Sequence, residues 1–196
     1  MKISTLVVGL GKIGMLYKNE NFFLFNNHCQ SIINHNKFKL VGGVDINKKK
    51  LKKFEENYQI PSFLNFKKAY DKTNPKMIIL STPTRINDKI FDYIKKKNIK
   101  PQIFVIEKPG SYNYKHFQNF SIYCKKKKIK LFVNYQRSFS NSLKFFRNFV
   151  NSGKKIKIYI NYKKGFYNSC SHYINFFFNI FQSTKYNIIK IKKYKK

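Results

Sequence analysis

The chain has 196 residues, and its 41 lysines and arginines against 8 acidic residues give a formal net charge of +33. This length suffices for one full domain and part of another, and the 42% hydrophobic content in alternating apolar segments excludes a disordered chain. Such a charge suggests a nucleic-acid or anionic-surface binder. However, only Arg85, Arg137 and Arg147 are arginines, the residue on which nucleic-acid readers depend. We therefore interpret the lysines as a codon bias toward A and T and expect no nucleic-acid partner.

The cysteines and the apolar runs place the chain in a reducing compartment. Cys29, Cys124 and Cys170 lie far apart and lack the spacing of metal ligands, so we expect neither a disulfide framework nor a metal site. The apolar stretch around residues 176–178 is too short to span a bilayer. A cytoplasmic protein without a membrane partner is the resulting expectation.

Short apolar runs alternate with helical patterns through the first two thirds of the chain. Strands are predicted over residues 3–8, 38–44, 62–64, 77–81, 103–106 and 130–134. Helices are predicted after Gly11, with an interruption, and over residues 28–33, 48–58, 66–70, 86–97 and 114–127. This alternation predicts an α/β fold of the Rossmann type, a doubly wound parallel sheet.

The pattern changes near residue 136. A helix is predicted over 141–151, a strand with one wet face over 156–162, an apolar helix over 173–181 and a last strand over 186–191. We predict a dinucleotide-binding domain over 1–136 and a shortened α+β second domain, for substrate binding or oligomerisation, over 137–196. Its sheet would expose an edge that a second copy of the chain could cover.

The first strand leads directly into Gly9, Gly11 and Gly14, the G-x-G-x-x-G spacing of a dinucleotide-binding turn. Gly9 permits a tight turn, Gly11 lets the backbone approach a pyrophosphate, and Gly14 lets the following helix pack on the sheet. The pyrophosphate would lie at the N-terminus of that helix, among unpaired N–H groups.

The second strand ends at Asp45, an acid that can bind the hydroxyls of an adenosine ribose. Its distance from Gly14 exceeds the usual spacing of about 20 residues, and a loop over 17–26 accounts for the excess. Asp45 favours NAD. The lysines at 48–50 could attract a 2′-phosphate, so NADP stays open, although we favour a solvated helix start for them.

The fifth strand runs into Glu107-Lys108-Pro109-Gly110. Pro109 fixes the backbone just past Lys108, at the edge where open parallel sheets bind ligands. A lysine held there can meet a substrate hydroxyl and, with a pKa lowered by burial or a cationic neighbour, act as an acid or base.

With these motifs in place, the chain resembles the Gfo/Idh/MocA family of sugar and cyclitol dehydrogenases. The matching stretches, in order, are Gly9–Gly14, Val44-Asp45-Ile46, Ser81-Thr82-Pro83-Thr84, Glu107-Lys108-Pro109, Asn134-Tyr135-Gln136-Arg137 and Asn168-Ser169-Cys170-Ser171-His172. The sequence around Ser171 and the long loop before His28 are similar to members encoded with surface-polysaccharide biosynthesis genes.

The resemblance implies hydride transfer between a nicotinamide cofactor, NAD or NADP, and a secondary alcohol of a sugar, nucleotide sugar or cyclitol. It implies Lys108 and His172 as catalytic residues, and Lys108, Arg137, Asn168 and His172 as the substrate contacts. The implied cofactor-binding residues are Gly9, Gly11, Lys12, Ile13, Gly14, Asp45, Thr82, Pro83, Glu107 and Lys108.

Several positions depart from the family pattern. Asn168 stands four residues before the histidine, where many members have an acid, Asn175 replaces a frequent Asp, and Asn87 a frequent His. These changes shift acid–base chemistry onto Lys108 and His172. Because family members carry a larger second domain, the alternative is a truncated remnant that only binds a nicotinamide dinucleotide.

Overall fold

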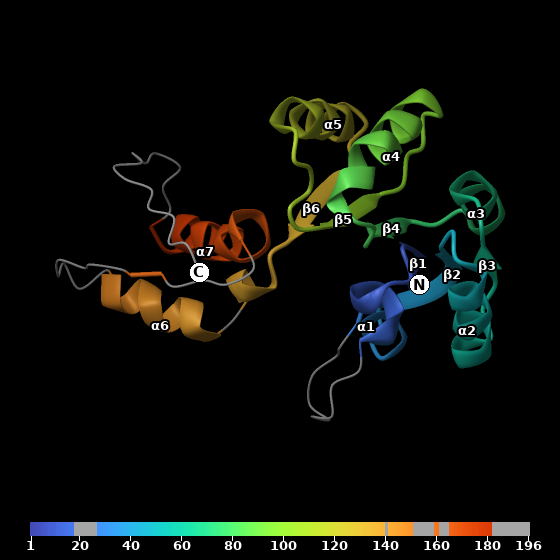
Figure 1. The fold of residues 1–196 in the computed structure, drawn as a ribbon, viewed down its shortest axis with the longest axis horizontal. Helices are drawn as coiled ribbons and strands as arrows, with labels where there is room; N and C mark the ends of the chain where they lie inside the picture. Colours follow the sequence, from blue (N-terminus) through green and yellow to red (C-terminus); the bar gives the residue numbers. More distant parts are fainter. Residues whose placement is uncertain (18–26, 140, 151–158, 161–164, 182–196) are drawn as a thin grey trace. The chain divides into compact units, whose positions relative to one another are not determined.

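A computed structural model describes residues 1–17, 27–139, 141–150, 159–160 and 165–181. The chain divides into two units, Met1–Asn134 and Tyr135–Lys196, which we describe one at a time (Figure 1). The predicted strand over 186–191 and most of the predicted loop over 17–26 lie outside the described residues. Of the predicted strand over 156–162, only residues 159–160 are described, and these two are not assigned to a strand.

The first unit is built on a six-stranded sheet in the order β3-β2-β1-β4-β5-β6, and every neighbouring pair is parallel. The strands are β1 Ile3–Val8, β2 Phe38–Val44, β3 Ser62–Phe63, β4 Met77–Leu80, β5 Ile103–Glu107 and β6 Lys130–Asn134. The order reverses between β1 and β4, as in a doubly wound fold. The predicted fold class is confirmed.

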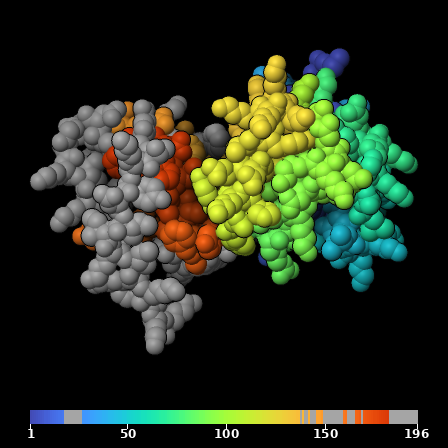
Figure 2. Space-filling model, turned by 90° about the horizontal axis from the view of Figure 1, so that it is seen from above, coloured from blue at the N-terminus to red at the C-terminus, as the bar shows by residue number. Residues whose placement is uncertain are grey.

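Helices cover both faces of the sheet because alternate strand residues point to opposite sides. The helices are α1 His28–Ile33, α2 Lys48–Tyr58, α3 Phe66–Thr73, α4 Thr84–Lys96 and α5 Tyr114–Lys126. Leu6 and Val8 of β1 pack with α3, α4 and α5, whereas Val7 between them packs with α1 and α2. Figure 2 shows the outer side chains of α4 and α5, in green and yellow, as one continuous surface.

Five of the described helices, α3 to α7, differ from their predicted bounds by one to three residues, and α3 and α4 are the clearest cases in the first unit. α3 continues past residue 70 to Thr73 and ends where Asn74 adopts a left-handed conformation with φ +38°. α4 begins at Thr84, two residues early, directly after Pro83 with its extended ψ of 135°. The shared cause is local backbone geometry, which apolar periodicity does not report.

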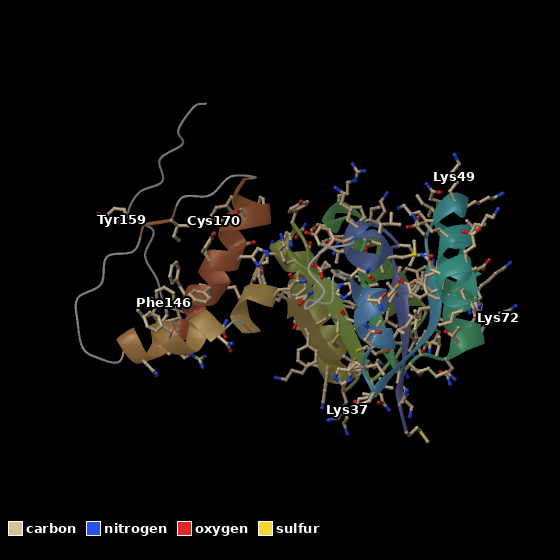
Figure 3. All side chains as sticks on the ribbon, turned by 90° about the horizontal axis from the view of Figure 1, so that it is seen from below. Lys37, Lys49, Lys72, Phe146, Tyr159 and Cys170 are labelled. Carbon is tan, nitrogen blue, oxygen red and sulfur yellow. The ribbon has the colours of Figure 1, made fainter. Side chains whose placement is uncertain are left out.

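Several lysines of the first unit lie on helix surfaces. Lys95 and Lys96 end α4, and Lys125 and Lys126 end α5, where a cation interacts favourably with the helix dipole. Figure 3 shows Lys49 and the more distant Lys72 projecting outward from α2 and α3, and both side chains are exposed.

The described part of the first crossover connection holds two short helical pieces. A π-helical turn, η1 (Lys12–Leu16), forms directly after the glycines, and the Leu16 N–H donates to the Gly11 carbonyl at 3.0 Å. The extended backbone of Tyr17 ends η1, and Asn27 caps the start of α1; the Asn27 side-chain amide donates to the Tyr17 carbonyl at 3.0 Å. The predicted interrupted helix is therefore confirmed, and both pieces pack on the β1–β2 side of the sheet.

The described secondary-structure elements of the second unit are all helices. Its elements are η2 (Gln136–Phe139), α6 (Asn141–Val150), η3 (Phe166–Cys170) and α7 (Ser171–Phe181). α6 and α7 are joined by the guanidinium of Arg147, which donates from Nε and Nη2 to the Asn179 carbonyl at 3.0 and 2.8 Å. That carbonyl lies in the last turn of α7, where intrahelical donors run out.

Candidate functional site

The turn after β1 can only be made by glycine at its first position. Gly9 has φ +95°, and a Cβ there would lie 2.8 Å from the backbone carbon of Ser81. Its N–H donates to the Val44 carbonyl at 2.7 Å. The ends of β1, β2 and β4 therefore meet at this residue.

The next two glycines of the motif have opposite surroundings. A Cβ on Gly14 would lie 1.9 Å from the Gly9 carbonyl oxygen, so η1 packs against the turn only without a side chain there. A Cβ on Gly11 would meet nothing within 4 Å. The backbone at Gly11 thus faces open space, which is the cradle that a close-approaching pyrophosphate requires. The residues present fit a dinucleotide.

Asp45 is 9% exposed, and its carboxylate is bonded on both oxygens. Oδ2 accepts from the Leu10 N–H at 2.9 Å and lies 3.1 Å from Nζ of Lys50, while Oδ1 accepts from the Asn47 N–H at 2.9 Å. Asp45 therefore ties the glycine turn to the start of α2. The interpretation of the 48–50 lysines as a solvated helix start is wrong for Lys50, because one helical turn carries its ammonium group back to the Asp45 carboxylate.

The loops after β4 and β5 are joined by a buried amide. Asn87 is fully buried; its Oδ1 accepts from the Thr82 hydroxyl at 2.8 Å, and its Nδ2 donates to the Gly110 carbonyl at 2.8 Å. The side chain thus fixes the spacing between the Thr82-Pro83 loop and the Lys108-Pro109-Gly110 loop. The Lys108–Pro109 peptide bond is cis.

Glu107 is the second junction at this edge. Its Oε1 accepts from Nδ2 of Asn134 at 2.7 Å and lies 2.8 Å from Nε2 of His28. Burial raises the pKa of this carboxyl, but hydrogen bonds from His28 and Asn134 and the charges of His28 and Lys108 outweigh burial, so the pKa lies below its usual value. Glu107 is therefore an anion, directly before the half-buried Lys108.

The remaining predicted site residues belong to the second unit. His172 lies in the first turn of α7, with its ring edge-on to the Tyr135 ring at a centroid distance of 5.8 Å. Burial raises the pKa of Tyr135, and a hydrogen bond with Ser171 opposes that shift. Arg137 lies in η2 and Asn168 in η3, and their side chains are outside what the structure describes.

The first unit thus brings together Gly9, Gly11, Gly14, Asp45, Thr82, Pro83, Glu107 and Lys108 at the carboxyl ends of the strands. Lys12 and Ile13 are exposed on η1, directly after the open face of Gly11. The site residues predicted from the sequence do not include His28, Lys50, Asn87 and Asn134. Asn87 and Asn134 had a signal, since both lie in or beside matching motif stretches. Lys50 had a weak signal as one of the three lysines at 48–50, whereas nothing in the sequence indicated the contact of His28 with Glu107, 79 positions away.

Neither a metal centre nor a membrane span emerges from the described residues. Within them, no three His, Cys, Asp or Glu side chains are grouped so that they could hold a metal ion. In the same ranges, no helix combines the length and the apolarity that crossing a membrane demands.

Three solved structures show the same fold. WlbA dehydrogenase from Bordetella pertussis, in complex with NADH and UDP-GlcNAcA, is 19% identical, with a TM-score of 0.74 over 92% of this chain and 58% of its own. Myo-inositol 2-dehydrogenase from Lactobacillus plantarum is 17% identical, with a TM-score of 0.64 over 78% of this chain and 42% of its own. Dehydrogenase MviM from Clostridium difficile is 21% identical, with a TM-score of 0.59 over 76% of this chain and 44% of its own.

The chain therefore spans about half of the length of these structures. No curated protein matches it. A family described as an oxidoreductase family with an NAD-binding Rossmann fold matches residues 3–135. Because this match covers more than half of the chain, and agrees with the glycine turn and the Glu107-Lys108-Pro109 edge, the chain belongs to the Gfo/Idh/MocA oxidoreductase family.

Proposed function

We propose that this protein is an NAD-dependent dehydrogenase acting on a secondary alcohol of a sugar, nucleotide sugar or cyclitol. The observation that carries the proposal is the open face of Gly11, beside the Asp45 carboxylate and at the strand edge that ends in Lys108. Open parallel sheets bind ligands at this edge, where the strand order reverses. Bound NAD would supply the hydride acceptor in this chemistry.

The glycine turn and Asp45 have separate roles toward the dinucleotide. The backbone at Gly11 would lie against the pyrophosphate, with Lys12 and Ile13 flanking it. The Asp45 carboxylate would accept hydrogen bonds from the ribose hydroxyls, which favours NAD over NADP because a 2′-phosphate would meet a negative charge. Thr82, Pro83 and Glu107 would line the same edge at the ends of β4 and β5.

Lys108 and His172 would handle the proton. As the alcohol carbon gives up a hydride, its hydroxyl must lose a proton, and a side chain that bonds the hydroxyl is placed to take it. Lys108 follows β5 at the ligand edge and would bind that hydroxyl. His172 would act as the second acid–base or orienting group, with Arg137 and Asn168 contacting the substrate from the predicted second domain, 137–196.

Lys50 would set how strongly the protein prefers NAD over NADP. Its ammonium lies 3.1 Å from Asp45 Oδ2, so it offsets part of the charge that would repel a 2′-phosphate. Replacing Lys50 by Met should weaken NADPH binding more than NADH binding. Lys49→Met, on the exposed side of α2, is the matched control. Equal changes in the dissociation constants of NADH and NADPH would show that Lys50 does not contact the 2′ position of the adenosine ribose.

The test of the proposed function is a calorimetric titration of the protein with NADH and NADPH, followed by a turnover screen. We expect saturable NADH binding that Gly11→Val weakens without lowering the unfolding midpoint, since a side chain there would occupy the cradle alone. Turnover on a sugar, UDP-sugar or cyclitol should then disappear in Lys108→Ala, while NADH binding should weaken far less than it does in Gly11→Val. Absence of binding to either cofactor would refute the proposal; binding without turnover would leave a dinucleotide-binding protein only.

A further inference from the structure

The Glu107 carboxylate joins three elements that are distant in the sequence. His28 begins α1, Glu107 ends β5 and Asn134 ends β6. Both partners reach the same oxygen, Oε1, at 2.8 and 2.7 Å. The His28 and Glu107 side chains are only 13% and 16% exposed, so this is a nearly buried junction and not a surface ion pair.

A buried carboxylate in such a junction is costly to disturb. Removing one partner of a buried charged pair leaves a charge without compensation, and the remaining group must move toward water or take up a proton. Charge-assisted hydrogen bonds are also shorter and stronger than neutral ones. Loss of the His28 contact should therefore change the position of Glu107 and not only the local stability.

Glu107 is bonded covalently to Lys108, so its position is passed to the lysine through one peptide unit. On the other side of the lysine, the Gly110 carbonyl is held by Asn87 at 2.8 Å. The segment from Glu107 to Gly110 is thus fixed at both ends by side chains from α1, β6 and α4. Of these, His28 comes from the side of the glycine turn, because α1 and η1 pack on the same face of the sheet.

We propose that His28 is a positioning residue for Lys108, acting through the Glu107 carboxylate that it binds at the end of β5. The inference rests on the proposed function, in which Lys108 bonds the reacting hydroxyl. His28 itself touches neither the substrate nor the cofactor in this assignment. Its contribution is to keep Glu107 in place when the Lys108 ammonium meets a ligand.

The kinetic test uses two replacements that separate the hydrogen bond from the bulk of the ring. His28→Phe keeps a ring but removes the N–H donor, and His28→Gln keeps a donor. We expect His28→Phe to lower kcat about 10- to 100-fold, since small displacements of a catalytic group cost rates of that order, with the NADH dissociation constant changed less than about threefold. His28→Gln should recover most of kcat. His35→Gln, in the exposed segment just after α1, should match the wild type.

A measurement without turnover keeps the inference separate from the proposed function. In the ligand-free protein, amide hydrogen exchange at Glu107 and Lys108 should be faster in His28→Phe than in His28→Gln, with no change in β1 and β4. Where the wild type turns over a substrate, equal kcat for the two variants would overturn the proposal. Where it turns over none, the proposed function fails, and equal exchange rates at Lys108 would overturn the role of His28 by themselves.

Discussion

The two units of this protein differ in how their large apolar side chains are covered. In the first unit, Phe54, Phe91, Phe104 and Phe120 are at most 1% exposed, packed between the sheet and its helices. In the described part of the second unit, Phe145, Phe146, Phe166, Tyr167 and Phe181 are 44–68% exposed, and within those residues the buried apolar side chains are Cys170 and Ile180.

The polar contacts differ in burial. In the first unit, the fully buried Asn87 side chain joins the Thr82 and Gly110 loops. In the described part of the second unit, the side-chain contacts that join helices are only partly buried: Ser138 bonds Asn175, and Arg147 bonds the Asn179 carbonyl. The difference teaches that the first unit carries its own core and its own ligand edge. Mutations of apolar core residues should accordingly have larger effects on stability in the first unit than in the second.

The largest effect should come from Gly14→Ala. Its Cβ would lie 1.9 Å from the Gly9 carbonyl oxygen, and backbone must move to relieve that contact. We expect a loss of at least about 3 kcal/mol in the free energy of unfolding, measured by urea denaturation. Gly11→Ala is the matched control, because open space lies at its Cβ, and it should unfold like the wild type while binding NADH less tightly. Equal stability of the two variants would contradict the packing described for η1.

The contrast between the cores is sharpened by Phe120→Ala and Phe146→Ala. Phe120 is fully buried and stacks on Phe91 with centroids 4.1 Å apart, so its removal should cost about 3–5 kcal/mol. Phe146, drawn on α6 in Figure 3, is 44% exposed and meets Phe176 edge-on at 5.7 Å; its removal should cost about 1 kcal/mol. Thermal unfolding followed by circular dichroism measures both. A comparable loss from Phe146→Ala would mean that the exposed aromatic side chains of the second unit are covered in solution.

A smaller loss is expected from Asn87→Ala. The replacement leaves the Gly110 carbonyl and the Thr82 hydroxyl without their buried partner, which should cost about 1–3 kcal/mol. Asn119→Ala, on the exposed face of α5, should stay within about 0.5 kcal/mol of the wild type. Urea denaturation of both variants distinguishes the two, and a neutral Asn87→Ala would show that water replaces the amide at this junction.

The sequence predicted the sheet well because its strands are short apolar runs separated by turn residues, from Ile3–Val8 to Lys130–Asn134. It also predicted Gly9 and Gly14 as required glycines, for reasons that the backbone distances now give. Motif spacing carried this information, since the G-x-G-x-x-G pattern identifies the turn although the atoms that crowd Gly9 belong to Ser81 of a distant loop.

The contacts that complete the candidate site were not predictable in the same way. The His28–Glu107 pair spans 79 positions, and the segment at 18–26 separates His28 from the glycine motif, so no local pattern announces it. In the sequence, Lys50 is not distinguishable from the neighbouring lysines of its run; only the fold of α2 places its ammonium group beside Asp45. The roles of Lys108, His172, Arg137 and Asn168 stay predictions, because the fold of a chain does not determine what its side chains do to a substrate.

The smallest effect should be a pH dependence that Glu107 gives to the first unit. In the folded chain its pKa lies below the ordinary value of 4.5, because hydrogen bonds from His28 and Asn134 and nearby positive charge outweigh the opposing effect of burial. The contribution of Glu107 to the free energy of unfolding is therefore fully present above about pH 4.5, its pKa in the unfolded chain, and is lost as the pH falls through the lower pKa of the folded chain.

Glu107→Gln removes the titration, so the unfolding free energies of wild type and variant should converge as the pH falls below the folded-state pKa. Urea denaturation between neutral and acid pH measures this, with the exposed Glu56→Gln as control. Parallel curves for Glu107→Gln and the wild type would mean that the His28 and Asn134 contacts do not hold the Glu107 carboxylate as an anion in solution. The charged contact between His28 and Glu107, through which α1 would influence Lys108, would then not exist.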